Sequence, residues 1–424
     1  MKITIIGAGS PYTPELIGKL AEEQQDMSVS EICLMDIDER RLEIMHGYCN
    51  RFGKQLGLKA AITKTGDRRR ALDGADFINT QIRVGGNRAR VNDEKIPLAR
   101  KLIGQETTGA GGFAKGLRTI PVMLDIAHDV EEICPDAWIV NYTNPSGLVA
   151  EAVTRYSKAK IAGLCSGGFT GRGAVVKALG VKPEQVRYDL FGLNHLSFAY
   201  NITVDGRPLT EEQFEKTAEA AGDPGKEIIR LWRAIPISYL NYYCHTAAKV
   251  KELSEAPMTR GEQVLALEDE LYAAFADPAC NTRPAVLDKR GGGGYAELAI
   301  LSIKAISKNR ETWMPANVPN RGTVRFLPDD AVIETMCMVN ASGYHPLLIG
   351  PPPKAVWGLV SAVKNYEQLA VEAAVSGSRE TALLALMAHP LVRDYDIAAA
   401  LLPELLEANR NYLPRFFGAG GSAE

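Results

Sequence analysis

Short apolar runs alternate with longer amphipathic stretches through the first part of the chain. The runs are rich in Ile, Val, Leu and other apolar side chains and cover residues 2–6, 31–35, 61–65, 76–81, 137–142 and 161–164. Continuous apolar runs of this length are typical of strands buried on both faces of a parallel sheet. Helical patterns separate them, for example up to Glu23 and from Glu39 to Leu56. The alternation predicts an α/β fold with a Rossmann-like, doubly wound sheet.

The pattern changes after Tyr200. The sequence predicts a hairpin at residues 201–208 and a strand with its loop at residues 317–330. The rest of the chain up to Tyr412 is predicted to be mostly helical, and a glycine run lies at 291–294. The glycine-rich tail at 418–422 predicts disorder. We therefore expect two domains: a Rossmann-like one over residues 1–200 and a C-terminal mixed, mainly helical α+β one over residues 201–424.

Composition narrows the class of protein. The 424 residues are 46% hydrophobic and 23% charged, as in ordinary globular proteins, and the net charge of −3 argues against nucleic acid or a membrane as a partner. No apolar run approaches the roughly 18 residues of a membrane span, and no signal pattern opens the chain. Seven scattered cysteines, an odd number, do not indicate a disulfide framework. We expect a cytoplasmic protein whose ligand is a small molecule.

A glycine turn joins the first strand to the first helix. Gly7 and Gly9, followed by Ser10, match the first two glycines of the dinucleotide-binding turn, and Tyr12 stands where the third would be. In that turn the chain bends tightly and the backbone comes close to a pyrophosphate. The strand before the turn and the helix after it are the context that the motif needs.

The second strand ends on two carboxylates, Asp36 and Asp38. An acidic residue at this place binds the ribose hydroxyls of NAD and repels the 2′-phosphate of NADP. The alternative is that Asp36 only caps the helix that begins at Glu39. With the glycine turn upstream, we predict that Gly7, Gly9, Ser10, Asp36 and Asp38 bind NAD.

Cys165 and His195 are candidates for a metal site. Cys165 ends the apolar run 161–164, and His195 lies inside the apolar segment 191–198. A thiol and an imidazole at the ends of buried elements could share one ion, and ligand softness alone favours zinc or iron. The alternative is that both are ordinary core residues.

Other candidates follow strand ends or lie in aromatic sequence. The polar loops at 83–94, 104–109 and 144–147 fall where ligands bind in open α/β sheets. Residues 237–245 hold three tyrosines and a histidine, a stripe that by its pattern is more often core than catalytic.

Taken together, these segments resemble glycoside hydrolase family 4, the NAD- and metal-dependent glycosidases, over nearly the whole chain. The motifs that carry the resemblance are Gly7–Ser10, Ile82–Gly86, Asp93–Leu98, Gly104–Thr107, Asn141–Pro145, Gly163–Cys165 and Gly192–His195. The segments Ser10–Leu16 and Gly192–Phe198 are most similar to the 6-phospho-β-glucosidase branch.

The resemblance implies roles for individual residues. Cys165 and His195 match the ligands of a divalent metal, commonly Mn²⁺, and Tyr239 matches the catalytic base. Glu106 matches a residue that supports the basicity of this tyrosine. The positions that contact the phosphorylated substrate are matched by Arg90, Asn144 and Arg260, and guanidinium groups suit a phosphate.

Ser166 departs from the family pattern. It occupies the catalytic position after the metal cysteine, where α-specific members carry an Asp general acid and the familiar β-branch carries Asn. A serine hydroxyl is far too weak an acid to replace a carboxylic acid at neutral pH. Ser166 therefore argues against an α-glycosidase of the Asp type and leaves protonation of the leaving group unassigned.

The implied reaction is hydrolysis of a phosphorylated glycoside or disaccharide without net redox change. NAD⁺ transiently takes a hydride from C3, the tyrosine removes the C2 proton, the glycosidic oxygen leaves C1, water adds, and the hydride returns. Another specificity within the family, an NAD-dependent sugar or 2-hydroxyacid dehydrogenase, and a nucleotide sensor without catalysis are the alternatives. We expect the active site at the domain interface and a homodimer or homotetramer built through the second domain.

Overall fold

The structure is a computed structural model that describes residues 1–290 and 294–418. Its largest element is a nine-stranded sheet in the order β13-β12-β11-β6-β5-β4-β1-β2-β3. Six of these strands run parallel to one another: β1 (Lys2–Ile6), β2 (Glu31–Met35), β3 (Ala61–Thr65), β4 (Phe77–Thr80), β5 (Trp138–Asn141) and β6 (Lys160–Gly163). The order β3-β2-β1-β4-β5-β6 is that of the doubly wound dinucleotide-binding fold, so the predicted fold class is confirmed.

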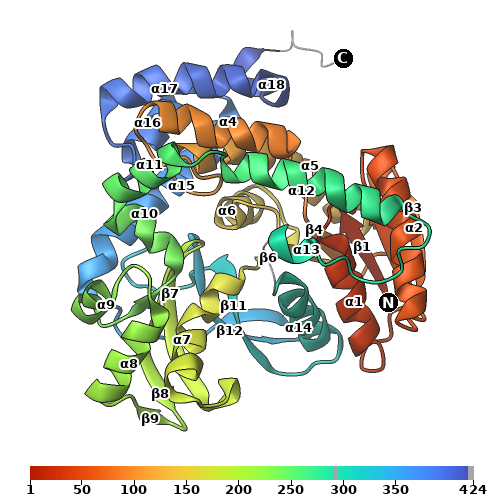
Figure 1. Ribbon diagram of the computed structural model, residues 1–424, viewed down its shortest axis with the longest axis horizontal. Helices are drawn as coiled ribbons and strands as arrows, with labels where there is room; N and C mark the ends of the chain where they lie inside the picture. Colours follow the sequence, from red (N-terminus) through yellow and green to blue (C-terminus); the bar gives the residue numbers. More distant parts are fainter. Residues whose placement is uncertain (291–293, 419–424) are drawn as a thin grey trace.

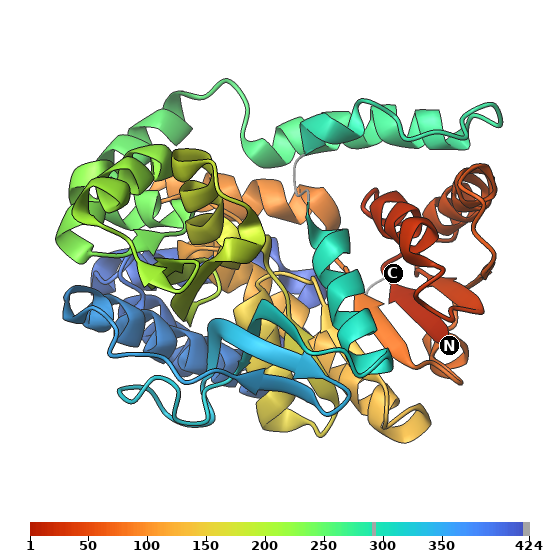
Figure 2. The same cartoon turned by 90° about the horizontal axis from the view of Figure 1, so that it is seen from below.

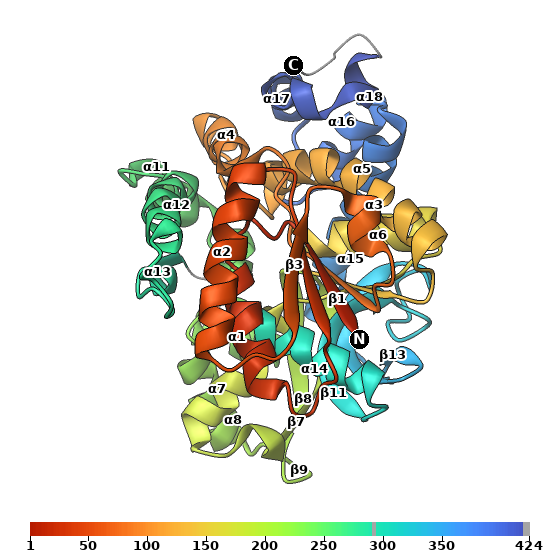
Figure 3. The same cartoon turned by 90° about the vertical axis from the view of Figure 1, so that its right-hand side faces the viewer.

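Helices cover both faces of the parallel strands (Figures 1 and 3). The helices α1 (Thr13–Glu23), α2 (Glu39–Gln55) and α14 (Tyr295–Ser307) lie on one face, and α3 (Arg68–Leu72), α5 (Gly109–Ile133) and α6 (Ser146–Tyr156) lie on the other. The predicted polar loop at 83–94 is a helix from residue 86, because α4 spans Gly86–Ala99. Within the described residues, no helix is long and apolar enough to cross a membrane.

The sheet continues into the second half of the sequence. Three antiparallel strands extend it beyond β6: β11 (Thr312–Pro319), β12 (Val332–Asn340) and β13 (Gly343–Pro346). The expectation that helices fill the chain after residue 330 is wrong at 332–346. Since β12 is buried along most of its length, its side chains do not alternate between apolar and polar in a way that marks a strand. The division at residue 200 stays a prediction, and the sheet draws strands from both sides of it.

A second, smaller sheet is antiparallel throughout. It contains β7 (Val186–Leu193), β8 (Leu196–Val204), β9 (Arg207–Pro208) and β10 (Ile235–Pro236). The hairpin predicted at 201–208 is formed by β8 and β9. His195 lies in the tight turn between β7 and β8, with a φ of 63°.

The remaining helices lie partly around this sheet and partly over the helices that cover the large sheet (Figure 1). They are α7 (Thr170–Leu179), α8 (Glu211–Ala221), α9 (Lys226–Trp232), α10 (Asn241–Cys244), α11 (Thr246–Glu255), α12 (Arg260–Ala276), α13 (Leu287–Arg290), α15 (Trp357–Ser376), α16 (Arg379–Ala388), α17 (Tyr395–Ala408) and α18 (Pro414–Phe417). Helix α12 runs across the outside of the molecule and packs on α2 and α4 (Figure 2). Most of the predicted glycine run and most of the tail, at 291–293 and 419–424, lie outside the described residues.

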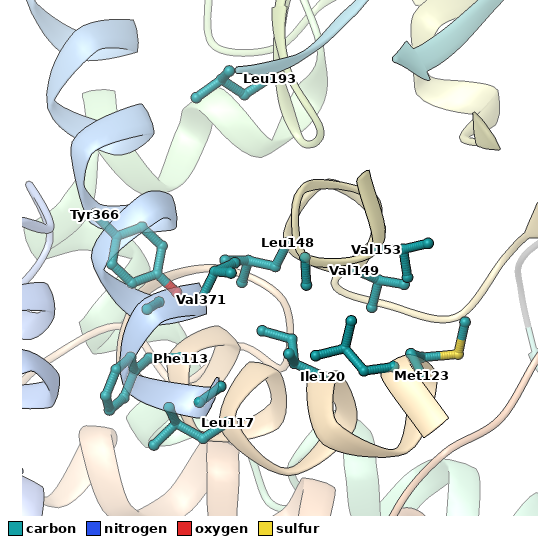
Figure 4. Close-up of a cluster of buried hydrophobic side chains, with 14 of the residues drawn as sticks. Phe113, Leu117, Ile120, Met123, Leu148, Val149, Val153, Leu193, Tyr366 and Val371 are labelled. Carbon is teal, nitrogen blue, oxygen red and sulfur yellow. The ribbon is translucent and has the colours of Figure 1, made fainter. Parts of the chain in front are cut away.

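The core that supports the site lies between α5, α6 and α15 (Figure 4). Phe113, Leu117 and Ile120 of α5 face Leu148 of α6 and Tyr366 of α15, and each is at most 4% exposed. Full burial of such a side chain contributes roughly 1.5–3 kcal/mol. Helix α5 is therefore a rigid platform for the polar residues at its N-terminal end.

Candidate active site

The carboxyl ends of β1, β4 and β5 open into a cavity of about 890 Å³. In doubly wound sheets this edge is where ligands bind. The cavity gathers ten of the residues singled out in the sequence: Gly7, Gly9, Ser10, Asp36, Asp38, Arg90, Glu106, Asn144, Tyr239 and Arg260. They come from seven separate segments of chain, which only the fold brings together.

Close backbone packing explains the glycines of the first turn. Gly7 has a φ of +87°, and a Cβ there would lie 3.0 Å from the backbone of Gln81. A Cβ on Gly9 would lie 2.8 Å from Asp36 Oδ2, which accepts a hydrogen bond from the Gly9 N–H at 2.8 Å. The turn thus presents backbone to the cavity at positions where a side chain does not fit. At the missing third glycine, Tyr12 packs its ring under the guanidinium of Arg290, 3.9 Å away.

The two carboxylates that follow β2, Asp36 and Asp38, have different hydrogen-bond partners. Asp38 is the N-cap of α2 and accepts from the Arg41 N–H at 2.9 Å. Asp36 accepts from the Gly9 and Asp38 N–H groups instead, so it joins the glycine turn to β2. Burial raises the pKa of the Asp36 carboxyl above its usual value. The helix cap is therefore Asp38, and Asp36 borders the cavity beside the turn.

A charge cluster centred on Glu106 forms part of the cavity wall. Glu106 forms ion pairs with Arg83, with Arg90 Nη1 at 3.0 Å and with Lys115 Nζ at 2.7 Å. Burial alone would raise the pKa of the Glu106 carboxyl, but Arg83, Lys115 and Arg90 together hold it well below its usual range. Glu106 is therefore a fixed anion that holds three cations in place.

Sequence reasoning missed Lys115. Its side chain is 3% exposed, and burial together with the charge of Arg83 lowers its pKa to about 7, against the opposing pull of Glu106. The signal was present in the sequence, since Lys115 is a single cation in the small-residue and apolar run 109–117. A lysine in such a run is rare unless it is paired or functional.

Glycines at the start of α5 place Glu106 against Lys115. A Cβ on Gly111 would lie 2.3 Å from the carbonyl oxygen of Gln105, and one on Gly112 would lie 2.5 Å from the backbone of Thr107. The segment 105–107 therefore rests directly on the first turns of the helix. One turn after Lys115, the fully buried Arg118 clamps Asp93 of α4 through two hydrogen bonds of 2.8 and 2.6 Å.

The two predicted metal ligands, Cys165 and His195, are buried and are not among the described residues that line this cavity. Cys165 follows β6, and burial together with Glu334 raises the pKa of its thiol to about 12. Burial lowers the pKa of His195 to about 4, so its imidazole is neutral, and its Nδ1 is buried with no hydrogen-bond partner. A neutral imidazole with a free buried nitrogen suits a divalent ion. The described residues contain no cluster of three or more His, Cys, Asp and Glu side chains for a metal.

Tyr239 connects this pair to the cavity. Its ring stacks on the imidazole of His195, with centroids 4.1 Å apart, and the same tyrosine lines the cavity. Burial, then the proximity of Cys165 and Glu106, raises the pKa of the Tyr239 phenol. Ser166 opens the short 3-10 helix at 166–169 directly after Cys165 and is not among the described residues that line the cavity.

Two further arginines, Arg260 and Arg290, line the cavity. Arg260 begins α12 and donates to the carbonyls of Lys289 and Arg290 at 3.0 and 2.8 Å, which leaves it at the exposed rim. Arg290, which sequence reasoning did not single out, is 6% exposed and lines the cavity with its Nε and Nη1 unpaired. Buried unpaired guanidinium nitrogens are strong donors for an anionic ligand.

A doubly wound sheet whose strand ends open into a cavity lined by several arginines defines a Rossmann-type protein. Residues 2–181 match the model of the Family 4 glycosyl hydrolases, and residues 190–392 match that of the Family 4 glycosyl hydrolase C-terminal domain. The chain belongs to family 4 of the glycosyl hydrolases, as the sequence motifs predicted.

Individual relatives match over nearly the whole chain. A protein of Bacillus subtilis (strain 168) named "Probable 6-phospho-beta-glucosidase" is 40% identical, covering 98% of both chains. The solved structure of the 6-phospho-beta glucosidase from Thermotoga maritima with NAD and glucose-6-phosphate has a TM-score of 0.91 at 35% identity, over 97% of this chain and 99% of that one. A second structure of that enzyme, with manganese, NAD⁺ and glucose-6-phosphate, has a TM-score of 0.89 at 34% identity, with the same coverage.

Proposed function

We propose that this protein hydrolyses 6-phospho-β-glucosides with the help of NAD and a divalent metal ion, Mn²⁺. The observation that carries the proposal is the whole-chain similarity to 6-phospho-β-glucosidases combined with the shared cavity at the sheet edge. A solved structure of the Thermotoga maritima relative contains manganese, NAD⁺ and glucose-6-phosphate, and this ligand set suits the candidate residues of this chain.

The residues present fit both cofactors. Gly7 and Gly9 expose backbone where a Cβ has no room, which suits a pyrophosphate, and Asp36 and Asp38 border the same end of the cavity for ribose hydroxyls. Cys165 and His195 would hold the metal ion, since the imidazole is neutral and one of its nitrogens is unpaired. When bound, NAD⁺ accepts and returns a hydride at the sugar, and the metal ion polarises the sugar oxygens.

The cationic wall is proposed to bind the phosphorylated sugar. Arg90, Asn144 and Arg260 contact the substrate, and the unpaired nitrogens of Arg290 add donors for a phosphate. Arg90 is held for this by Glu94, which accepts from Arg90 Nε at 2.8 Å and from the Gly261 N–H at 2.7 Å. The same carboxylate thus ties the Arg90 helix to the helix that begins with Arg260.

Tyr239 is proposed to remove the proton from C2 once the neighbouring carbon carries a ketone. Its stacking on His195 holds the ring against the metal ligands, where a bound cation lowers the pKa of the phenol. Glu106 orients the cations around the sugar and adds negative charge near Tyr239. Ser166 occupies the position of the family's general acid, but its hydroxyl is too weak an acid for this role. We therefore propose that the chain acts on β-linkages, and that the glycosidic oxygen leaves by elimination.

The division near residue 200, the homodimer or homotetramer and the cytoplasmic location remain part of the proposal. All seven cysteines, each within the described residues, are free thiols, which supports a reducing compartment.

The experiment is an assay of nitrophenyl glucosides, phosphorylated and unphosphorylated at C6 and of both anomers, with NAD⁺ and Mn²⁺. The proposal expects cleavage of the 6-phospho-β-glucoside, loss of activity with chelator, and no NADH in the steady state. Steady accumulation of NADH without glycoside cleavage would instead establish a dehydrogenase.

A further inference from the structure

The charge cluster around Glu106 contains one side chain that can exchange a proton at neutral pH. Its cations are Arg83, Arg90 and Lys115, and its other anion is Glu94, paired with Arg90. With every group charged, the cations outnumber the anions by one. Guanidinium groups stay protonated in proteins, whereas a buried lysine readily becomes neutral. Loss of a proton from Lys115 removes the excess charge.

Burial and the neighbouring cations favour loss of the proton from Lys115, and only Glu106 opposes it. Arg83 pairs with the same Glu106 oxygen as Lys115, and Arg90 pairs with the other oxygen. His195 lies within electrostatic reach as a neutral ring. The neighbouring Asp93 is already paired with Arg118, so it is not a second partner for Lys115. Burial and these charges lower the pKa of Lys115 to about 7.

A second buried lysine shows what a different environment does. Lys364 of α15 is 2% exposed and pairs with Glu151 Oε2 at 2.9 Å and Glu367 Oε2 at 2.5 Å. Burial alone would lower the pKa of Lys364, but its two carboxylates raise it above the usual value. Lys115, with one carboxylate shared among three cations, has the opposite balance, and it alone of the two lines the cavity.

The proposed reaction needs a base at the carbon that is oxidised. Removal of a hydride from C3 turns its hydroxyl into a ketone only if the hydroxyl proton also leaves, and Tyr239 is occupied with the proton of C2. We propose that neutral Lys115 is the base that takes the C3 hydroxyl proton and returns it when C3 is reduced, an inference that rests on the proposed function. The balance is closed: the hydride goes to NAD⁺, the proton goes to Lys115 Nζ, and both return to the same sugar.

The burial of Lys115 suits a base for the C3 hydroxyl better than an acid that protonates the leaving group. The aglycone must depart through the open part of the cavity, whereas the Lys115 side chain is 3% exposed and is paired with Glu106 at the cavity wall. A base shielded from water keeps its proton until the hydride returns. The clamp between Arg118 and Asp93, one turn along α5, holds this helix against α4, and Glu106 holds the ammonium group at 2.7 Å.

The first test separates the two proton transfers. In Tyr239→Phe the sequence of steps stops after C3 oxidation, so mixing with substrate is expected to give a rise in absorbance at 340 nm from NADH. Adding Lys115→Met to this variant is expected to slow that rise by about 10²-fold or more. Lys115→Arg keeps the charge but accepts no proton, and it should be equally slow. An unchanged rate of NADH formation in Tyr239→Phe/Lys115→Met would overturn the inference.

A rescue experiment excludes a merely structural role. In Lys115→Ala, added methylamine is expected to restore part of the oxidation rate, with a dependence on pH that follows the free amine. NAD⁺ affinity and thermal stability of each variant are measured alongside. Rates that stay low at every amine concentration in a folded variant that binds NAD⁺ would count against Lys115 as the base.

The third test titrates Lys115 in the wild-type protein, so its result depends neither on activity nor on the stability of a variant. The ¹⁵Nζ resonance of Lys115, assigned by its loss in Lys115→Arg, is expected to titrate between about pH 6 and 8, while that of Lys364 stays in its charged form. A midpoint for Lys115 above about pH 9 would overturn the inference. If the wild-type protein cleaves no 6-phospho-β-glucoside, the proposed function fails; if it cleaves one and Lys115 titrates like a free lysine, only this inference fails.

Discussion

The phenol ring of Tyr239 lies parallel to the imidazole of His195, with the ring centroids 4.1 Å apart and an angle of 2° between the planes. Tyr239 belongs to a 3-10 helix that follows β10, and His195 to the turn between β7 and β8, so two separate parts of the smaller sheet build the stack. The stack therefore places the proposed base, Tyr239, in direct contact with a proposed metal ligand, His195.

Tyr239→Phe keeps the stacked ring and removes only the hydroxyl. We expect thermal stability close to that of the wild type, a fall in kcat of about 10²-fold or more, and loss of exchange of the C2 hydrogen with solvent deuterium. Tyr242→Phe is the control, because its ring lies edge-on to Tyr239 at 6.0 Å and it should retain C2 exchange. Normal turnover and exchange in Tyr239→Phe would remove Tyr239 from the role of base.

Cys165→Ser tests the metal site. The pKa of the Cys165 thiol, about 12, means that binding of a divalent ion must release a proton from it at neutral pH. We expect the serine variant to lose Mn²⁺ affinity and the associated proton release, measured by calorimetry in two buffers, while NAD⁺ binding is unchanged. Cys280→Ser serves as a control, since Cys280 is a half-buried free thiol outside the cavity lining. Chelator-sensitive activity that survives in Cys165→Ser would contradict the assignment.

Asp36→Ala tests nucleotide recognition. The variant loses the acceptor for the Gly9 and Asp38 N–H groups, so we expect weaker NAD⁺ binding and less discrimination against NADP⁺. Asp67→Ala is the matched control: Asp67 caps α3 through the Arg70 N–H, and its loss should cost about 1 kcal/mol of stability without changing nucleotide affinity. Equal affinities of wild type and Asp36→Ala for both nucleotides would leave Asp36 with a structural role alone.

Glu334→Gln tests a buried carboxyl near Cys165. Burial raises the pKa of Glu334 to about 7 in the folded protein, from a usual value of 4.5. A carboxyl whose pKa is raised by folding favours the folded state at low pH, and this contribution is lost as pH rises through about 7. We expect the glutamine variant to match the wild type below about pH 4.5 and to gain stability above it, by at most about 3 kcal/mol at pH 8. Thermal melts of the metal-free proteins across this range give the difference, which must grow with pH if the wild-type carboxyl is neutral in the fold.

Gly111→Ala tests the support under Glu106. The added methyl group would lie 2.3 Å from the Gln105 carbonyl and 2.4 Å from that of Asp93, so the segment 105–107 must move away from α5. We expect a loss of stability of roughly 1–3 kcal/mol and a larger relative loss of kcat. Gly173→Ala, in α7 with nothing within 4 Å of the added carbon, should instead be neutral or stabilising by up to about 1 kcal/mol. Similar melting temperatures of the two variants would contradict this packing account.

The sequence by itself determined the features that depend on neighbouring residues in the chain. The alternating runs that became β1 to β6, the glycine turn at Gly7 and Gly9, and the place of Cys165 after β6 all follow from local composition and spacing. The family motifs identified the class of enzyme for the same reason, since each is a short contiguous segment. The structure confirms the fold class and the family model confirms the family, so local sequence patterns were sufficient to predict both.

Only the tertiary structure decided which groups share an environment. It showed that 332–346 are strands of the large sheet, that Asp38 and not Asp36 caps α2, and that Glu106 binds three cations at once. Burial and pairing shift the pKa of Lys115 to about 7, and both arise from residues that lie on other elements. Protonation depends on distances and desolvation in space, which the order of residues along the chain does not contain.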